Sequence, residues 1–440
     1  MTDLEFSKEV RIPIHGYVGL TEKEVELVDS FCFQRLRKIK QLANTHLVYP
    51  GATHSRFEHS LGALETGYQI ARRIKSICND EDKMRRLRYA ILLHDIGHGP
   101  FSHVFEDIVM RIGKLKPSEF SHELVTVDLL CNDEELMGIL GSDLDGVVDL
   151  LRPTTKFVEH HIVSGPLDAD KIDYLQRDSY HAGVAYGVFD AVRVIHTLKE
   201  IPGGFLNRRE SYLGASIKGR EAIIGMQLAY YYMHEAVYSH KTRRIADAML
   251  IRSIELAATN DESFDTNIFQ YTQDDKDFLE SFKKLDDRKL VDLVLESSDK
   301  TAHEIIESLN RRKLFKAVFG KDMSEINPQT RMNLTQITYE ETKKLEEALG
   351  EYIGIDPNFI IVDRQSIDNP LYREPYGIPK TGPIYFETED GKVLEFADIP
   401  SPLSRTRSGS VERFWVYAQV KEDERKEKEK LVEDFINSSL

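Results

Sequence analysis

An apolar run that leads straight into a histidine–aspartate pair is the feature that most restricts how this chain can fold. Residues 89–93 read Tyr-Ala-Ile-Leu-Leu, and His94 and Asp95 follow directly. A helix that buries this run carries the pair against the core, where an ionised carboxylate costs several kcal/mol unless a positive group meets it. A divalent cation is such a group. The other interpretation, a helix end with only local hydrogen bonds to Asp95, leaves the adjacent histidine unexplained.

Histidines are concentrated around this pair. Seven of the fifteen in the chain lie within residues 46–122, where an even spread would give about three. The helix is broken at residues 97–100, Gly-His-Gly-Pro, which lets His98 and His103 turn back toward the pair. The cluster consists of His46, His54, His59, His94, His98, His103 and His122.

Arg56 and His59 stand at the expected start of the preceding helix. A guanidinium at this place can bind phosphate oxygens bidentately, and an imidazole beside it can bind a metal ion. A surface salt bridge is the alternative for Arg56.

An acidic stretch far along the chain can complete the site. Within residues 165–178, Asp170, Tyr174 and Asp178 recur at i, i+4 and i+8, so they share one helix face, and Asp168 is placed as the N-cap. A solvated acidic face is the alternative. Two imidazoles and two carboxylates form a mixed site that suits Mn, Fe, Zn, Co or Ni, and Mg more weakly. Such a set leaves positions for water and a phosphate oxygen.

Composition restricts the class of protein further. The net charge of −16 argues against nucleic acid as a partner, although a local basic pocket can still bind a phosphorylated small molecule. The three cysteines form no C-x-x-C pair, and neither a signal peptide nor a membrane-spanning run is evident. We expect a soluble, cytoplasmic protein that binds no membrane. The P-loop, H-E-x-x-H, G-x-S-x-G and G-x-G-x-x-G motifs do not occur.

Helical periodicity dominates up to about residue 350, and β-rich runs follow from about residue 359. Helices are expected at 21–43, 58–78, 83–96, 101–112, 120–131, 143–151, 155–164, 168–181, 190–199 and 218–258, and further helices over 265–350. Hairpins are expected between 203 and 214 and at Asp390-Gly391, and a mobile loop at 401–411. The predicted fold is mainly α, divided into a strand and turn segment (1–20), a main helical domain (21–258), a helical region (259–355) and a smaller α+β C-terminal lobe with a charged tail (356–440).

The chain resembles the HD-domain phosphohydrolases, whose pattern is H…HD…D on a helical scaffold. Within them it is most similar to the deoxynucleoside triphosphate triphosphohydrolases, the SAM-and-HD-domain enzymes and their bacterial relatives. The likeness covers about residues 8–255. It is carried by 33–37 (Phe-Gln-Arg-Leu-Arg), 41–42, 50–54 (Pro-Gly-Ala-Thr-His), 56–60 (Arg-Phe-Glu-His-Ser), 94–103, 170–174 and 238–241.

The resemblance implies a role for each matching residue. The metal ligands would be His59, His94, Asp95 and Asp170. The phosphates would face Arg56, His98 and Lys171. Acid–base chemistry would fall to His103 and His122. The sugar and the rest of the pocket would be contacted by Gln41, Leu42, Tyr174, Asp178 and Tyr238.

The activity implied is hydrolysis of a dNTP to deoxynucleoside and triphosphate, by attack of metal-bound water at the α-phosphorus. Arg56 would absorb developing charge, and a histidine would protonate the departing 5′-oxygen. The resemblance also implies a homo-oligomer, a tetramer or a dimer. Asp29, Gln34 and Arg37 match the site at which the family binds an activating guanine nucleotide, dGTP or GTP. The alternative is that these residues form the solvated side of an amphipathic helix.

Departures from the family pattern keep other functions open. Tyr230 stands where relatives hold phosphate with an arginine, Ser239 replaces a glutamine, and Arg11-Ile12 replaces a familiar Asn-Asp pair. The alternatives are another HD activity, on nucleoside monophosphates or on nucleic acid as a nuclease, and a catalytically silent regulator that binds nucleotides.

Overall fold

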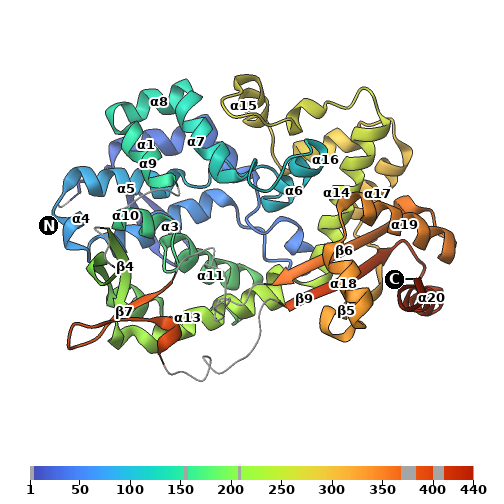
Figure 1. The fold of residues 1–440 in the computed structure, drawn as a ribbon. Coiled ribbons are helices and arrows are strands. Elements are labelled where there is room, and N and C mark those ends of the chain that lie inside the picture. The colour runs from blue at the N-terminus through green and yellow to red at the C-terminus, as the bar shows by residue number, and fades with distance from the viewer. Residues whose placement is uncertain (1–3, 153–156, 207–209, 368–382, 400–410, 440) are drawn as a thin grey trace. The chain divides into compact units, whose positions relative to one another are not determined.

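The computed structural model describes residues 4–152, 157–206, 210–367, 383–399 and 411–439 (Figure 1). Within these ranges the chain is mainly helical with small sheets, which confirms the expected fold class. Of the loop expected at 401–411, residues 401–410 lie outside the described ranges. A search of the described helices finds none with the length and apolar character needed to cross a membrane.

The chain divides into two compact units. The first unit consists of Met1–Val237, Thr266–Lys289 and Pro370–Arg407, and the second of Tyr238–Asp265, Leu290–Asn369 and Ser408–Leu440.

The first unit is a helical body with two small sheets. Its helices are α1 (Glu22–Asp29), α2 (Phe31–Arg35), α3 (Arg56–Ala71), α4 (Lys75–Cys78), α5 (Glu81–Leu93), α6 (His103–Ile112), α7 (His122–Asn132), α8 (Glu134–Leu140), α9 (Leu144–Leu151), α10 (Val158–Val163), α11 (Ala169–Ala182), α12 (Ala191–Thr197), α13 (Arg220–Met233) and α15 (Lys276–Phe282). The hairpin of β1 (Lys8–Ile12) and β2 (Gly16–Leu20) precedes them, in the segment where the sequence predicts a strand and a turn. The second sheet has the order β3 (Leu198–Pro202), β4 (Ser211–Ser216), β7 (Tyr385–Glu387) and β8 (Val393–Glu395). Its antiparallel β3–β4 and β7–β8 pairs confirm both predicted hairpins.

Helix α3 packs against both α5 and α11, and these three helices carry the candidate site. Leu61 and Leu64 of α3, Leu92 of α5 and Ile172 of α11 are all inaccessible to solvent. Gly62 permits the close approach of α3 to α11, because a Cβ there would collide with polar side chains of α11. Apolar packing therefore fixes where the polar ends of these helices lie.

The second unit is built on an antiparallel sheet of order β5 (Lys316–Asp322), β9 (Val411–Ala418) and β6 (Ile360–Ile367). Phe414, Val416 and Val432 belong to a fully buried cluster that joins the sheet to its helices. The helices of this unit are α14 (Lys241–Asn260), α17 (Lys300–Asn310), α18 (Pro328–Gln336), α19 (Tyr339–Ile353) and α20 (Arg425–Ser439), and α16 (Asp287–Leu295) spans the boundary in sequence.

Five expectations about secondary structure are wrong. The single helix at 58–78 is interrupted, because α3 ends at Ala71 and the extended Ile74 precedes the separate α4. The single helix at 21–43 is interrupted at Ser30, which is extended and caps α2 by accepting from the backbone N–H of Phe33. The single helix at 218–258 is interrupted by a π-helical turn at His234–Tyr238, after which His240 caps α14. No helix is expected where α8 lies, although the N-cap residue Asp133 is a sequence signal for its start. Strand β5 lies where further helices are expected, because its partner β9 is distant in sequence.

Candidate metal centre

His59 lies in the first turn of α3, and its side chain is completely buried. Its Nδ1 donates to Asp173 Oδ2 at 2.9 Å, so Nε2 is directed toward the other carboxylates. Nε2 lies 3.0 Å from Asp170 Oδ1 and 3.8 Å from Asp95 Oδ2. Neither approach has hydrogen-bond geometry, and this buried nitrogen has no hydrogen-bond partner within the described ranges.

His94 is held in the same way. It follows the last residue of α5, and its Nδ1 donates to the carbonyl oxygen of Ile91 at 2.7 Å. Its Nε2 lies 3.3 Å from Asp95 Oδ1 and 3.8 Å from Asp170 Oδ1, again without a hydrogen bond to any residue that the structure describes. An imidazole whose Nδ1–H is engaged and whose Nε2 is free for a cation is typical of metal-binding histidines.

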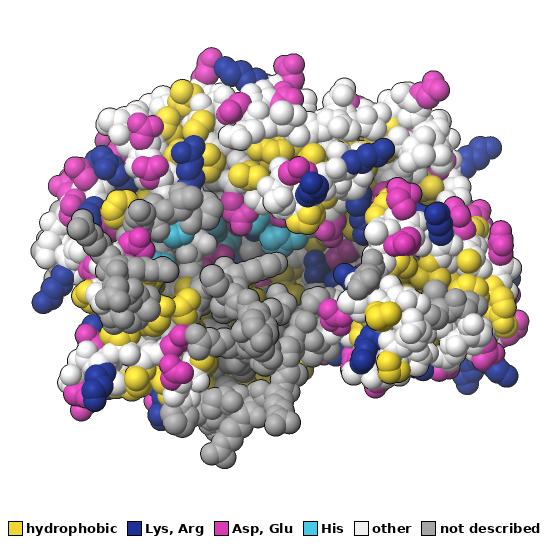
Figure 2. Space-filling view, in the orientation of Figure 1, with side chains coloured by type: hydrophobic (Ala, Val, Ile, Leu, Met, Phe, Trp, Pro, Cys, Tyr) yellow, Lys and Arg dark blue, Asp and Glu magenta, His cyan; other side chains and the backbone are white. Residues whose placement is uncertain are grey.

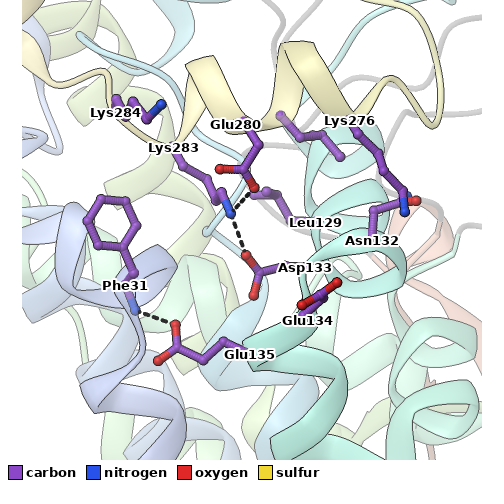
Figure 3. A pocket seen from close by; sticks show the side chains of 11 residues that line it. Phe31, Leu129, Asn132, Asp133, Glu134, Glu135, Lys276, Glu280, Lys283 and Lys284 are labelled. Atoms are coloured by element: carbon purple, nitrogen blue, oxygen red, sulfur yellow. Dashed lines mark hydrogen bonds and ion pairs between the residues drawn. The ribbon is translucent and has the colours of Figure 1, made fainter.

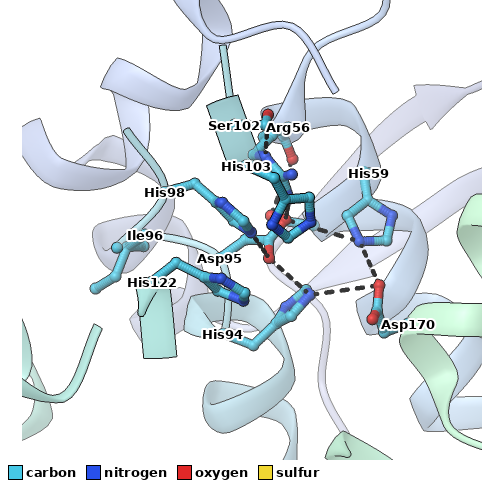
Figure 4. A network of polar contacts seen from close by, with 12 residues as sticks. Arg56, His59, His94, Asp95, Ile96, His98, Ser102, His103, His122 and Asp170 are labelled. Carbon is cyan, nitrogen blue, oxygen red and sulfur yellow. Dashed lines mark hydrogen bonds and ion pairs between the residues drawn. The ribbon is translucent and has the colours of Figure 1, made fainter. Parts of the chain in front are cut away.

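The two carboxylates come from different helices. Asp95 directly follows His94 and is almost fully buried, and Asp170 lies in the first turn of α11, whose N-cap is Asp168 as the sequence predicts. One ligand atom each from His59, His94 and Asp95 lie within 4.8 Å of one another. The structure therefore brings the four predicted ligands together (Figure 4). Histidines and acidic side chains also lie close together on the face of the molecule that Figure 2 shows. This histidine and aspartate cluster suggests a divalent metal site.

The electrostatics of the cluster favour a cation. Burial lowers the pKa of His59, but the neighbouring Asp170, Asp173 and Asp95 outweigh it and raise the pKa to about 10. Burial raises the pKa of Asp95, yet Arg56 and the histidines hold that pKa well below its usual range. The carboxylates are therefore ionised at neutral pH, and their field attracts positive charge to the point that the imidazoles face.

Metal affinity should rise with pH. At neutral pH, below its pKa of about 10, His59 carries a proton that a cation must displace. The dissociation constant should therefore fall by about tenfold per pH unit for each proton displaced. Titration of the protein with Mn²⁺ at two pH values, in two buffers of different ionisation enthalpy, measures the affinity and the protons released. An affinity that does not change with pH would contradict this assignment.

A second cluster adjoins the first and contains the predicted acid–base pair. His103 Nδ1 and His122 Nδ1 donate to the same atom, Glu106 Oε1, at 3.0 and 2.9 Å. His98 stacks on His122 with ring centroids 3.7 Å apart, and its Nε2 lies 3.3 Å from Asp95 Oδ1. The two clusters are therefore continuous through Asp95.

Glu106 is the functional candidate that the sequence reasoning missed. Its position at i+3 from His103 on α6 is the signal that could have found it. Burial raises the pKa of Glu106, but hydrogen bonds from both histidines lower it far more, so the carboxylate is ionised. Burial lowers the pKa of His122, and Glu106 raises it above its ordinary value. Burial, Arg56 and His122 hold the pKa of His98 well below its usual range.

The predicted phosphate-binding residues lie differently with respect to the cluster. Arg56 is buried. It donates from Nη1 to Asp95 Oδ2 at 2.6 Å and from Nε to Ser102 Oγ at 2.8 Å. Lys171 instead turns back along α11, where its Nζ donates to Asp168 Oδ2 at 2.7 Å and to Gly165 O at 3.0 Å. Arg56 is thus aimed at the centre, whereas Lys171 is engaged within its own helix cap.

Two of the residues predicted to line the pocket, Tyr174 and Asp178, lie on α11. The ring centroid of Tyr174 lies 6.5 Å from that of His59, and Asp178 Oδ1 accepts from His54 Nε2 at 2.7 Å. Gln41 Oε1 is buried with no hydrogen-bond partner in the described part of the chain. The next residue, Leu42, is also buried. Tyr238 belongs to the second unit, so its place in this pocket stays a prediction.

The predicted regulatory residues lie together on α1, α2 and the turn that follows. Asp29 is exposed, Gln34 Nε2 donates to the carbonyl oxygen of Val28 at 2.7 Å, and Arg37 Nε donates to Gln34 Oε1 at 2.8 Å. Arg37 also stacks on the ring of Phe57 at 3.5 Å. A nucleotide at this place stays a prediction.

A pocket of about 470 Å³ lies elsewhere in the first unit (Figure 3). Lys283 at its centre is already paired with Asp133 at 2.8 Å and with Glu280. Its charged lining residues are of both signs. They are three lysines (Lys276, Lys283 and Lys284) and four acids (Asp133, Glu134, Glu135 and Glu280). The pocket includes none of the residues predicted for the site, and we assign no chemistry to it.

Comparison with known proteins agrees with the geometry. Residues 56–178 match the HD domain family, and residues 206–372 match the HD associated region. An uncharacterized protein of Methanocaldococcus jannaschii is 31% identical over 438 residues, which cover 98% of this chain and 84% of that protein. The deoxynucleoside triphosphate triphosphohydrolase SAMHD1 of Homo sapiens is 28% identical over 428 residues, 86% of this chain and 64% of that protein. The crystal structure of a phosphohydrolase from Bacteroides thetaiotaomicron superposes with a TM-score of 0.72 at 26% identity, covering 94% of this chain and all of that one.

Proposed function

Because this chain belongs to the HD-domain phosphohydrolases that carry an HD-associated region, we propose that it hydrolyses deoxynucleoside triphosphates to deoxynucleoside and triphosphate. The observation that carries the proposal is the arrangement of His59, His94, Asp95 and Asp170 around one point, with Arg56 on one side and the Glu106 cluster on the other. The similarity to proteins named deoxynucleoside triphosphate triphosphohydrolases supports the choice of substrate.

The donor set fits a divalent cation, because two buried imidazole nitrogens without hydrogen bonds face the same carboxylates. When bound, such an ion lowers the pKa of water and offsets charge on a phosphate oxygen. Mn, Fe, Zn, Co and Ni suit two nitrogens and two oxygens, and Mg suits them less well.

The chain's own residues would then divide the remaining work. Arg56 is fixed by two hydrogen bonds that use Nε and Nη1, and Nη2 makes no hydrogen bond to any residue that the structure describes. That nitrogen is left to hold a phosphate oxygen as charge develops. Glu106 holds Nδ1 of His103 and of His122, so that an Nε2–H can protonate the departing 5′-oxygen, which contributes roughly 10²–10⁴-fold.

The sugar would lie against Tyr174 and Asp178, which occupy the same face of α11 as Asp170. An aromatic ring can exclude a 2′-hydroxyl, and a carboxylate can accept from a 3′-hydroxyl. The same resemblance supports a guanine nucleotide activator at Asp29, Gln34 and Arg37, and assembly into a homo-oligomer.

Product analysis with the four dNTPs, singly and mixed, tests the proposal. With Mn²⁺ the protein should release unmodified deoxynucleoside and triphosphate. Release of dNMP or dNDP would reject attack at the α-phosphorus. Activity only in the mixture would reveal an activator. Nucleotide that raises the melting temperature but is recovered intact would show a regulator instead of an enzyme.

Tyr230 favours a phosphatase acting on nucleoside monophosphates as the second candidate. It stands where the arginine of the related enzymes would hold a phosphate. A neutral phenol binds a triphosphate less strongly than an arginine would. Hydrolysis of a monophosphate panel in preference to dNTPs would establish this reading.

A further inference from the structure

We propose that His15, in the hairpin between β1 and β2, is a positioning residue for the metal centre and acts through Asp173 on His59. The inference rests on the proposed function, because it concerns the cation that this function requires. It assigns the N-terminal hairpin to the site, although His15 lies 158 residues from Asp173 in sequence.

Asp173 is the link between the hairpin and the metal ligand. It is completely buried, and four N–H groups surround its two oxygens. Oδ2 accepts from His59 Nδ1 at 2.9 Å and from Arg177 Nε at 2.8 Å. Oδ1 accepts from Arg177 Nη2 at 2.8 Å and from His15 Nε2 at 2.7 Å. The carboxylate is thus held at each end, and the bond from His15 is the shortest of the four.

The fold brings three separate elements to this carboxylate. Arg177 lies one turn beyond Asp173 on α11, and His59 comes from α3. Gly62 of α3 leaves the space that Asp173 and Arg177 occupy, since a Cβ there would overlap both side chains. His15 alone comes from outside the two helices.

The hairpin is shaped to deliver this imidazole. Ile14 has φ of 75° and Gly16 has φ of 79°, so a β-branched residue is held in the left-handed region beside His15. Such a conformation is unfavourable for a β-branched residue and persists where the surroundings enforce it. The side chain of Ile14 is exposed, whereas only 9% of the His15 side chain is accessible, so the imidazole is the side chain that this turn buries.

The effect on the metal follows from the hydrogen-bond chain. Asp173 sets the tautomer and the orientation of His59, and His15 keeps Asp173 from turning fully toward Arg177. Loss of a group that bonds directly to a metal ligand typically costs about 10–100-fold in metal affinity, and His15 acts on such a group, Asp173, from one step further out. A role limited to anchoring the hairpin would lower stability and leave the affinity of the folded protein unchanged.

Two substitutions at one position separate these roles. His15→Leu removes the donor, whereas His15→Gln keeps an N–H at a similar distance from the backbone. The full-length protein is stripped of metal and titrated with Co²⁺, whose visible absorption reports the geometry of its ligands. Melting temperatures of the stripped variants are measured alongside. Glu24→Gln is the control. Like Asp173, Glu24 is a buried acid that pairs with an arginine, here Arg88 at 2.6 Å, but it contacts no candidate ligand.

We expect His15→Leu to bind Co²⁺ more weakly, by up to about 10-fold, with an altered spectrum, and His15→Gln to stay near wild type. Glu24→Gln should lose stability and keep its Co²⁺ affinity. Wild-type affinity in His15→Leu would overturn the proposal, as would equal weakening in all three variants. A wild-type protein that binds Co²⁺ but leaves dNTPs intact would refute the proposed function alone, and one that binds no Co²⁺ would refute both.

Discussion

Replacement of His94 by alanine should remove the bound divalent cation and lower phosphohydrolase turnover by about 10³-fold or more. His94 presents a buried Nε2 without a hydrogen bond to the carboxylates of Asp95 and Asp170. Alanine deletes one of two nitrogen donors, so the remaining set holds a cation less strongly. Without the ion, water at neutral pH is a poor nucleophile. Metal analysis of the purified variant and product release from a dNTP measure the two effects.

His160→Ala is a control matched in its local bonding. The Nδ1 of His160 also bonds to a backbone carbonyl, that of Leu150, at 2.8 Å, and His160 is buried in the same unit. Its loss should lower stability by a comparable amount and leave the metal content unchanged. A His94→Ala protein that keeps its metal and turns over substrate would show that the ligands lie elsewhere.

The centre of the site could be predicted from sequence because its parts are local patterns. The apolar run before His94 is the buried end of α5, and the i, i+4, i+8 spacing of Asp170, Tyr174 and Asp178 is one face of α11. Each pattern places its residues on an element, and the packing of α3 between α5 and α11 then unites them. Arg56 could be found for the same reason, since it opens α3.

The supporting residues could not be predicted in this way, because their partners are distant and the fold decides which of them meet. Asp173 serves His59 across 114 residues, and nothing in the local pattern distinguishes it from the neighbouring acids of α11. Arg35 reads as one of several basic residues on an amphipathic helix. It is buried instead, and its Nη2 donates to the carbonyl oxygens of Ile96 and His98 at 2.8 and 2.7 Å. It thereby fixes the turn that follows Asp95.

Replacement of Glu106 by glutamine should lower turnover by roughly 10²–10⁴-fold while the metal stays bound. Glu106 contributes no atom to the group of His59, His94 and Asp95. It accepts from Nδ1 of His103 and of His122, and its charge keeps the pKa of His122 above the ordinary value although burial lowers it. Glutamine keeps the shape and removes the charge, so the pKa of His122 falls and its acid form is lost at lower pH. Turnover should therefore decline at a lower pH in the variant than in the wild type.

Metal content, turnover and the pH profile together separate this role from metal binding. Glu123→Gln is the matched control, because Glu123 lies 3.5 Å from the other nitrogen of His122 but is largely exposed, where solvent screens its charge. It should change neither the rate nor the pH profile by more than a small factor. A Glu106→Gln protein that loses its metal would place Glu106 among the ligands. Wild-type turnover with an unchanged pH profile would remove the Glu106 cluster from the chemistry, and the proton for the departing oxygen would then have to come from another group.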